Sequence, residues 1–243
     1  ISHFIEHLLF DGTKKRRARE IANEIESIGG EINAATTNER TFYYVHVLKK
    51  HFDKALDILS DIMQNPIFSN EMVEKERKII MDEIDLVTDD PKFHQWILFQ
   101  KTLFKKHPTR NPVYGDRDVI SKLKRQELID FYKSYYTPNN MIIVVSGGFD
   151  NVLERIDEAF KNFKSRGVVG VKEVVEPANL KVEEFREKKE VLHSYLVLGY
   201  KTVKRSDEDS YVLDVIEAIL GRGLSGRLYD EIRTKRGLAY NVG

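Results

Sequence analysis

Residues 1–13, ISHFIEHLLFDGT, carry two histidines and a glutamate in the spacing H-x-x-E-H. The chain has 7 histidines among its 243 residues, yet His3 and His7 are separated by a single helical turn. On a helix, positions 3, 6 and 7 share one face, and histidines at i and i+4 can both reach one tetrahedral metal ion. Glu6 would then lie beside the metal, where it could take a proton from water. The alternative is a helix whose polar face simply meets solvent.

Composition excludes several classes of protein. Lys+Arg 39 balance Asp+Glu 39, so the chain lacks the basic footprint of a protein that binds nucleic acid or an anionic membrane. There is no apolar run of about 18 residues, which predicts no membrane-spanning helix. The absence of cysteine excludes disulfides, thiolate ligands and a cysteine nucleophile. Any metal must therefore be held by histidines and carboxylates.

Periodicity predicts alternating helices and short strands. A strand pair is expected within 31–47, a buried strand at 140–148, a strand and linker over 165–187 and a further strand at 190–203. A domain boundary is expected near 170–185. After it, a strand at 190–203 and a helix at 207–220 would be followed by a third element at 224–235. Helices are expected at 2–10, 16–28, 52–66, 70–88, 125–136, 150–163 and 207–220. More helix is expected after Pro91, through about residue 104.

The helix at 70–88 offers two candidates for a third metal ligand. Glu76 and Glu83 are two turns apart on one face, and Ile79 and Ile80 of the apolar stripe fall between them. A carboxylate beside a buried stripe is costly unless it is paired or bound to a metal. Surface ion pairs with basic neighbours on this heavily charged helix are the alternative. Spacing alone does not choose between the two glutamates.

Three motifs in order, HFIEHLLFDGT (3–13), GGEINAATTNERTFYY (29–44) and ERKIIMDEID (76–85), carry a family resemblance. The chain resembles the family of pitrilysin, insulysin and mitochondrial processing peptidase, the inverted-motif zinc peptidases. The resemblance extends over essentially the whole chain. It implies an α+β fold of the LuxS/mitochondrial-processing-peptidase-like metallohydrolase type. Each domain would be an antiparallel sheet with helices packed on one face, and the second, similar domain would be incomplete.

The same resemblance implies the activity and the residues that perform it. One Zn²⁺ per chain would be held by His3, His7 and Glu83, which selects between the two glutamates of the second helix. Glu6 would act as general base on the zinc-bound water, and Glu76 would be an accessory residue that supports a ligand or the water network. The chain would then be a zinc metalloendopeptidase that hydrolyses peptides or unfolded segments inside a clamshell chamber.

Two further pairs of residues match positions that the family uses for substrate. Asn33 and Ala34 match substrate-contacting positions on an edge strand to which a peptide would add as an extra strand. The alternative for them is an ordinary strand with a polar outer face. In LYDEIRTKRGLAYNV (228–242), Arg233 and Tyr240 match a pair that holds the substrate carbonyl opposite the zinc. Without the resemblance, Arg233 would be a solvated helix residue and Tyr240 a core aromatic.

Domain organisation and assembly follow from the positions of these motifs. Residues 1–172 would be the zinc-binding catalytic domain, and 185–243 the start of a second, homologous, truncated domain that carries Arg233 and Tyr240. The resemblance implies a homodimer, or a heterodimer with a related subunit, in which each chamber combines one chain's zinc with the other chain's Arg/Tyr pair. The sequence opens inside a helical pattern and stops at GLAYNVG, where a strand would begin, so we expect a piece of a longer chain.

Two other functions remain open from the sequence. One is a non-catalytic structural or regulatory subunit of the same fold, and the other is a peptide-binding module that uses only the edge strand. The complete set of His3, Glu6, His7 and Glu83 argues against both, and zinc content would discriminate. The remaining histidines have no comparable context and are expected to be structural or exposed: His46, His51, His94, His107 and His193.

Overall fold

The computed structural model describes residues 1–167, 170 and 173–243. These residues form two compact units, Ile1–Leu198 and Gly199–Gly243. The strand-and-linker segment predicted over 165–187 includes residues 168–169 and 171–172, which lie outside the described residues. Its other residues contain no strand.

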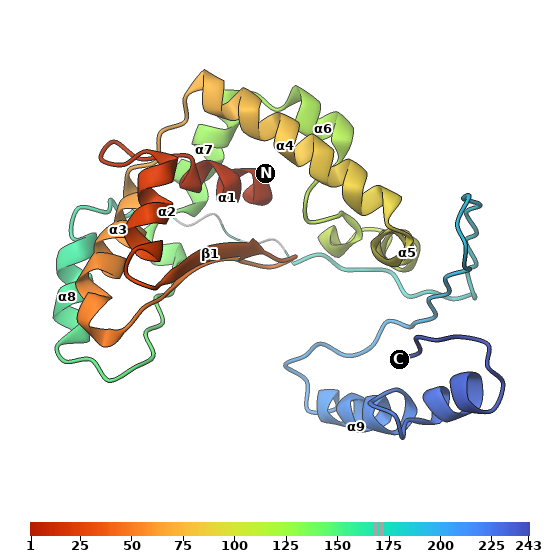
Figure 1. The fold of residues 1–243 in the computed structure, drawn as a ribbon. Helices are drawn as coiled ribbons and strands as arrows, with labels where there is room; N and C mark the ends of the chain where they lie inside the picture. Colours follow the sequence, from red (N-terminus) through yellow and green to blue (C-terminus); the bar gives the residue numbers. More distant parts are fainter. Residues whose placement is uncertain (168–169, 171–172) are drawn as a thin grey trace. The chain divides into compact units, whose positions relative to one another are not determined.

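The first unit is mainly helical, with one hairpin of two strands (Figure 1). The helices predicted over the first 163 residues are confirmed, with ends displaced by a few residues, and Pro91 begins a new helix directly after α4. The elements are α1 Ser2–Phe10, α2 Ala18–Glu26, β1 Glu31–Thr36, β2 Thr41–His46, η1 Lys49–His51, α3 Phe52–Gln64, α4 Asn70–Asp89, α5 Pro91–Leu103, η2 Pro108–Arg110, α6 Arg117–Lys122, α7 Arg125–Tyr135, η3 Pro138–Asn140 and α8 Val152–Phe160.

The predicted strand pair is confirmed as the β1–β2 hairpin. The strands are antiparallel, in a register that runs from Glu31 opposite His46 to Thr36 opposite Thr41. Gly29, with φ of 74°, ends α2 in the left-handed conformation that glycine adopts without strain. Within the described residues the sheet has only these two strands, so β1 has a neighbour on one side and a free edge on the other.

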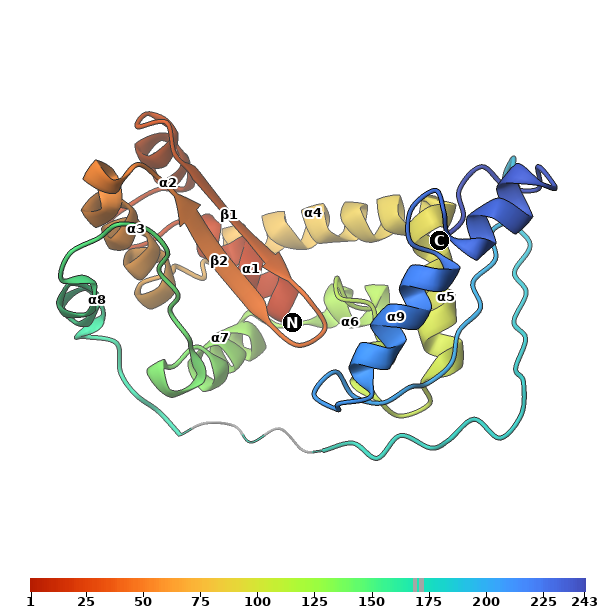
Figure 2. The ribbon, with the colours of Figure 1, turned by 90° about the horizontal axis from the view of Figure 1, so that it is seen from below.

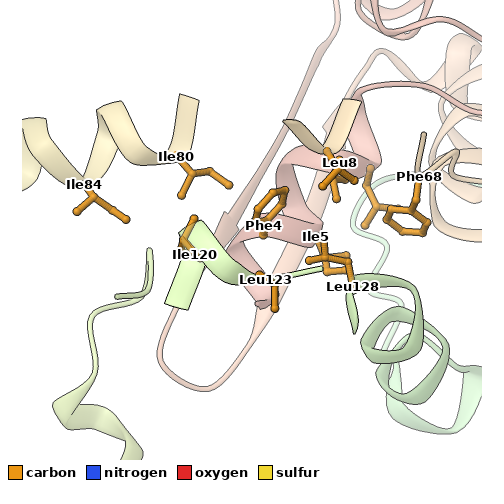
Figure 3. Close-up of a cluster of buried hydrophobic side chains, with 11 residues drawn as sticks. Phe4, Ile5, Leu8, Phe68, Ile80, Ile84, Ile120, Leu123 and Leu128 are labelled. Carbon is orange, nitrogen blue, oxygen red and sulfur yellow. The ribbon is translucent and has the colours of Figure 1, made fainter. Parts of the chain in front are cut away.

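The main core gathers around α1, which lies between α4 and the hairpin (Figures 1 and 2). Its apolar side chains fall on one stripe because they recur at i, i+1, i+4 and i+5. Figure 3 shows Phe4, Ile5 and Leu8 of α1 against Ile80 of α4 and Leu128 of α7. The buried members of this cluster are Phe4, Ile5, Leu8, Leu9, Phe68, Val73, Ile80, Ile84, Ile120, Leu123 and Leu128.

A second core joins α2 and α3 to the hairpin. Ile21 and Ile25 of α2 are buried against Ile58 and Ile62 of α3, and Ile32 of β1 packs on them. The two cores together hold α1, α2 and α3 against the sheet, as the α+β class predicts. This arrangement fixes the position of β1 relative to α1.

The predictions of strands at 140–148 and 190–203 are wrong. Both segments lie outside any sheet in the structure, and Ile142 is 92 % and Leu192 97 % exposed. The GLAYNVG segment at the end is likewise not a strand. Alternating apolar residues give only a tendency, whereas a strand also needs a partner with free backbone groups. Residues after the first segment instead pack on α3, where the tilted rings of Phe149 and Phe52 have centroids 4.5 Å apart.

The second unit contains α9, Ser210–Leu220, and η4, a π-helix at Tyr229–Thr234. The predicted helix at 207–220 is confirmed, and η4 occupies part of the element predicted at 224–235. No helix among the described residues has the length and apolar character needed to span a bilayer.

Two adjacent isoleucines of α4 test the core. Ile80 is fully buried beside Phe4, whereas Ile79 is 41 % exposed. We expect Ile80→Ala to lower the free energy of unfolding by about 2–5 kcal/mol, because it leaves a cavity under α1. Ile79→Ala, the matched control, should change it by less than about 1 kcal/mol. Urea denaturation of each variant measures both, and equal losses would contradict this assignment of the core face.

Candidate metal centre

The stripe of α1 opposite its buried side chains carries the three residues of the H-x-x-E-H motif. His3, Glu6 and His7 are each partly exposed, while the residues between and after them are buried. Helix α4 packs against α1 and carries Glu76 and Glu83. The packing of two helices therefore brings together residues that are about 80 positions apart in the chain.

His3, His7 and Glu83 converge on one point. The Nε2 atoms of His3 and His7 lie 3.5 and 3.6 Å from the same atom, Glu83 Oε2. One ligand atom from each of the three residues lies within 4.8 Å of the others. A tetrahedral zinc ion with bonds of about 2.0–2.1 Å separates its ligand atoms by roughly 3.4 Å. Two imidazoles and one carboxylate at these separations fit a zinc ion, and no other such cluster occurs among the described residues.

The charges of the three residues also favour a cation. Burial, and then the neighbouring His7, lower the pKa of His3 to about 4, so its imidazole is neutral and able to coordinate metal at neutral pH. Burial raises the pKa of Glu83, His7 partly opposes this rise, and the negative charge of Glu6 adds to it. A divalent cation among these groups would relieve the cost of holding Glu83 ionised.

Glu76 occupies a different place from Glu83. Its Oε2 accepts a hydrogen bond of 2.9 Å from His7 Nδ1, on the side of the ring away from Nε2. Burial alone would raise the pKa of Glu76, but the hydrogen bond from His7 and the contact with Lys75 hold it at about 2. For His7, burial would lower the pKa, yet its bond to Glu76 raises it. Glu76 therefore fixes the orientation of the His7 ring, and leaves Nε2 directed toward Glu83.

Thr36, at the end of β1, is a residue that the sequence did not indicate. Its Oγ1 donates a short hydrogen bond to Glu6 Oε2, and lies 3.0 Å from Thr41 Oγ1 across the hairpin. The hairpin thus holds the carboxylate of Glu6 from outside the helix that carries it. Nothing in the spacing of H-x-x-E-H points to a residue 30 positions away, so only the packing of β1 on α1 could reveal it.

Asn33 and Ala34 lie on β1, three and two residues before Thr36. They face Tyr44 and Tyr43 of β2 in the register, and the side chain of Asn33 is exposed. Asn33 Oδ1 accepts a hydrogen bond of 2.8 Å from the backbone N–H of Ala34. The structure therefore places both residues on the strand with the free edge, two to three residues before Thr36 and its contact with Glu6.

Arg233 and Tyr240 come together within the second unit. The guanidinium carbon of Arg233 lies 4.3 Å from the centroid of the Tyr240 ring and 4.9 Å from that of Tyr229. Tyr240 is 83 % exposed, so it is not a core aromatic. These distances are typical of cation–π contacts, which hold the guanidinium of Arg233 next to the Tyr240 ring.

A small antiparallel sheet with helices packed on it, and H-x-x-E-H on one of those helices, is the α+β metallohydrolase architecture predicted from the sequence. Residues 1–117 match the family described as Insulinase (Peptidase family M16), and residues 122–243 match the domain described as Peptidase M16 inactive domain. The chain therefore belongs to the insulinase family of peptidases, and the resemblance noted in the sequence is confirmed.

Relatives with similar sequences are named as zinc proteases. The chain is 36 % identical over 248 residues to an uncharacterized zinc protease of Mycobacterium leprae, covering 99 % of this chain and 55 % of that protein. It is 33 % identical over 244 residues to one of Bacillus subtilis, covering 100 % and 59 %. A crystal structure of a protease from Helicobacter pylori superposes with a TM-score of 0.87 at 26 % identity, over 99 % of this chain and 59 % of that one. The chain thus spans little more than half the length of these relatives.

Replacing Glu83 tests the metal centre directly. We expect Glu83→Gln to weaken zinc binding by more than about 100-fold, since the loss of a direct ligand should exceed the 10- to 100-fold cost of losing an outer partner. Competition with a chelating dye measures the zinc dissociation constant. Asp82→Asn removes an exposed carboxylate at the preceding position and should leave the constant unchanged. Equal affinities in the two variants would show that Glu83 is not a ligand.

Proposed function

We propose that the full-length protein is a zinc-dependent endopeptidase that hydrolyses peptides or unfolded segments. The observation that carries this proposal is the convergence of His3 Nε2 and His7 Nε2 on Glu83 Oε2, at 3.5 and 3.6 Å, with Glu6 on the same stripe of α1. Further support comes from membership of the insulinase family and from relatives named as zinc proteases.

The proposed chemistry assigns one role to each residue of the centre. His3, His7 and Glu83 hold the zinc, which when bound polarises a peptide carbonyl and makes the attacking water more acidic. The carboxylate of Glu6 accepts the proton that the attacking water loses, and then donates it to the nitrogen of the departing amine. Thr36 holds one oxygen of Glu6, so that the carboxylate meets the water in a fixed orientation.

The proposed substrate site is the free edge of β1. A peptide that adds there as a third strand would pair with the backbone beside Asn33 and Ala34, and its main chain would run past Thr36 toward Glu6. Main-chain pairing accepts many sequences, since side chains contribute little to it. This favours extended peptides over folded proteins as substrates.

The proposal extends to the second part of the chain and to assembly. Residues 1–172 would be the catalytic domain, and residues 185–243 the start of a homologous domain. Arg233 and Tyr240 would donate hydrogen bonds to the substrate carbonyl as negative charge develops on it. In the dimer of like or related chains, this pair would serve the zinc centre of the partner.

A mixed-sequence peptide with a quenched fluorophore tests the proposed activity in the full-length protein. We expect cleavage that a zinc chelator abolishes and added zinc restores. Glu6→Gln should retain zinc and lose turnover by about 100- to 10,000-fold, the usual contribution of a general base. Glu26→Gln, an exposed glutamate of α2, is the control and should cleave normally. Loss of zinc from Glu6→Gln would mean that Glu6 is structural.

Thr36→Val tests the contact between the hairpin and Glu6. Valine keeps the shape of threonine but cannot donate to Glu6 Oε2, so we expect kcat to fall about 10-fold, which corresponds to a hydrogen bond of about 1.4 kcal/mol. The zinc dissociation constant should not change, and Thr36→Ser should recover most of the rate. A parallel loss of zinc would contradict this role, because it would indicate a disturbed α1.

A non-catalytic subunit is the second candidate, favoured by the match of residues 122–243 to a domain described as inactive. It predicts a full-length protein that contains zinc and cleaves no peptide by itself. Restoration of cleavage by a related subunit would then identify the missing half of the chamber.

A further inference from the structure

We propose that Lys75 is a positioning residue for the zinc centre, acting through Glu76 on His7. This inference rests on the proposed function, since it assumes that His7 binds zinc through Nε2. It adds to that function a residue which determines how tightly the metal is held. The assignment comes from a continuous chain of contacts that begins at the end of α1 and returns to His7.

Lys75 bridges two buried carboxylates. Its Nζ lies 2.6 Å from Asp11 Oδ1 and 2.9 Å from Glu76 Oε1. The other oxygen of Glu76, Oε2, accepts the hydrogen bond of 2.9 Å from His7 Nδ1. Both oxygens of Glu76 are therefore engaged, one with the ammonium group and one with the ring. The Glu76 carboxylate cannot rotate without breaking one of these contacts.

The two carboxylates require a compensating charge. The side chains of Glu76 and Asp11 are only 6 % and 7 % exposed, and a carboxylate so far from water is costly unless it is paired. Asp11 carries a second cost, because it caps the C-terminus of α1, where the helix dipole disfavours negative charge. Among the described residues, no lysine or arginine other than Lys75 forms an ion pair with either carboxylate.

Coordination of zinc makes the role of Lys75 stronger. A neutral His7 that uses its Nε2 for metal donates its Nδ1 proton to Glu76, and Glu76 then has Lys75 as its remaining cationic partner. His3 has no such support, since its Nδ1 is buried without a hydrogen-bond partner among the described residues. The orientation of one imidazole ligand therefore depends on Glu76, and the position of Glu76 depends on Lys75.

The same ammonium group also joins the two helices that carry the ligands. Lys75 precedes Glu76 on α4, and Asp11 immediately follows α1. Elsewhere these helices meet through the apolar side chains of the core and through the contacts of His3 and His7 with Glu76 and Glu83. A polar contact at the end of α1 fixes its orientation, and with it the approach of His3 and His7 to Glu83.

The experiment is a zinc-affinity cycle on the full-length protein, by competition with a chelating dye at one neutral pH. Lys75→Met keeps the length of the side chain and removes its charge, and we expect it to weaken zinc binding about 10-fold, at the lower end of the range for outer partners. Lys75→Arg should retain wild-type affinity within about 3-fold. Lys78→Met removes an exposed lysine of the same helix and should have no effect.

A double-mutant cycle separates positioning through Glu76 from a general loosening of the structure. If Lys75 acts through Glu76, the Lys75→Met/Glu76→Gln protein should bind zinc no more weakly than Glu76→Gln alone. Additive losses, or an unchanged affinity of Lys75→Met, would overturn the inference while leaving the zinc centre intact. A wild-type protein that binds no zinc would overturn the proposed function, and this inference with it.

Discussion

The packing of α1 on α4 is the contact on which the candidate centre depends. Phe4, Ile5 and Leu8 are buried against α4 and α7, and their burial sets the rotation of α1 about its axis. Successive residues of a helix are about 100° apart, so a rotation by one position would turn His3 and His7 away from Glu83 and expose part of the apolar stripe. Burial of that stripe is favourable by several kcal/mol. The same rotational position of α1 therefore forms both the hydrophobic core and the metal centre.

Glu76 and Glu83 show how similar positions acquire different roles. Both lie on one face of α4, yet partners lower the pKa of Glu76 to about 2, whereas burial, opposed by His7 and reinforced by Glu6, raises that of Glu83. Glu76 is held by His7 and Lys75, and its role is to orient the His7 ring. Glu83 has no lysine or arginine partner among the described residues, which leaves its oxygen for a cation. The two glutamates differ because each meets different side chains, His7 and Lys75 in one case and His3 and His7 in the other, and not because their positions on α4 differ in periodicity.

The hairpin connects the proposed site of hydrolysis to the proposed site of substrate binding. β1 ends at Thr36, whose hydroxyl holds Glu6, and the free edge of the same strand carries Asn33 and Ala34. A rigid strand that contacts Glu6, the proposed general base, at one end would position an extended peptide with little additional reorganisation. The pair of Arg233 and Tyr240 is assembled within its own unit by stacking, so its geometry does not depend on the hairpin.

The sequence by itself determined the helices of the first 163 residues except α6, together with the hairpin, the family and the set of candidate residues. The helices and the hairpin follow from local periodicity and from turn residues such as Gly29, and His3, Glu6 and His7 follow from a motif defined within one helix. The choice of Glu83 and the other candidate residues follow from the family resemblance. Periodicity failed at 140–148 and 190–203, because a strand exists only where a distant partner offers its backbone. It also failed to separate Glu76 from Glu83 and to reveal Thr36 or Lys75. Those roles depend on which groups meet across helices and strands, and contacts between residues far apart in the chain are decided only when the cores pack.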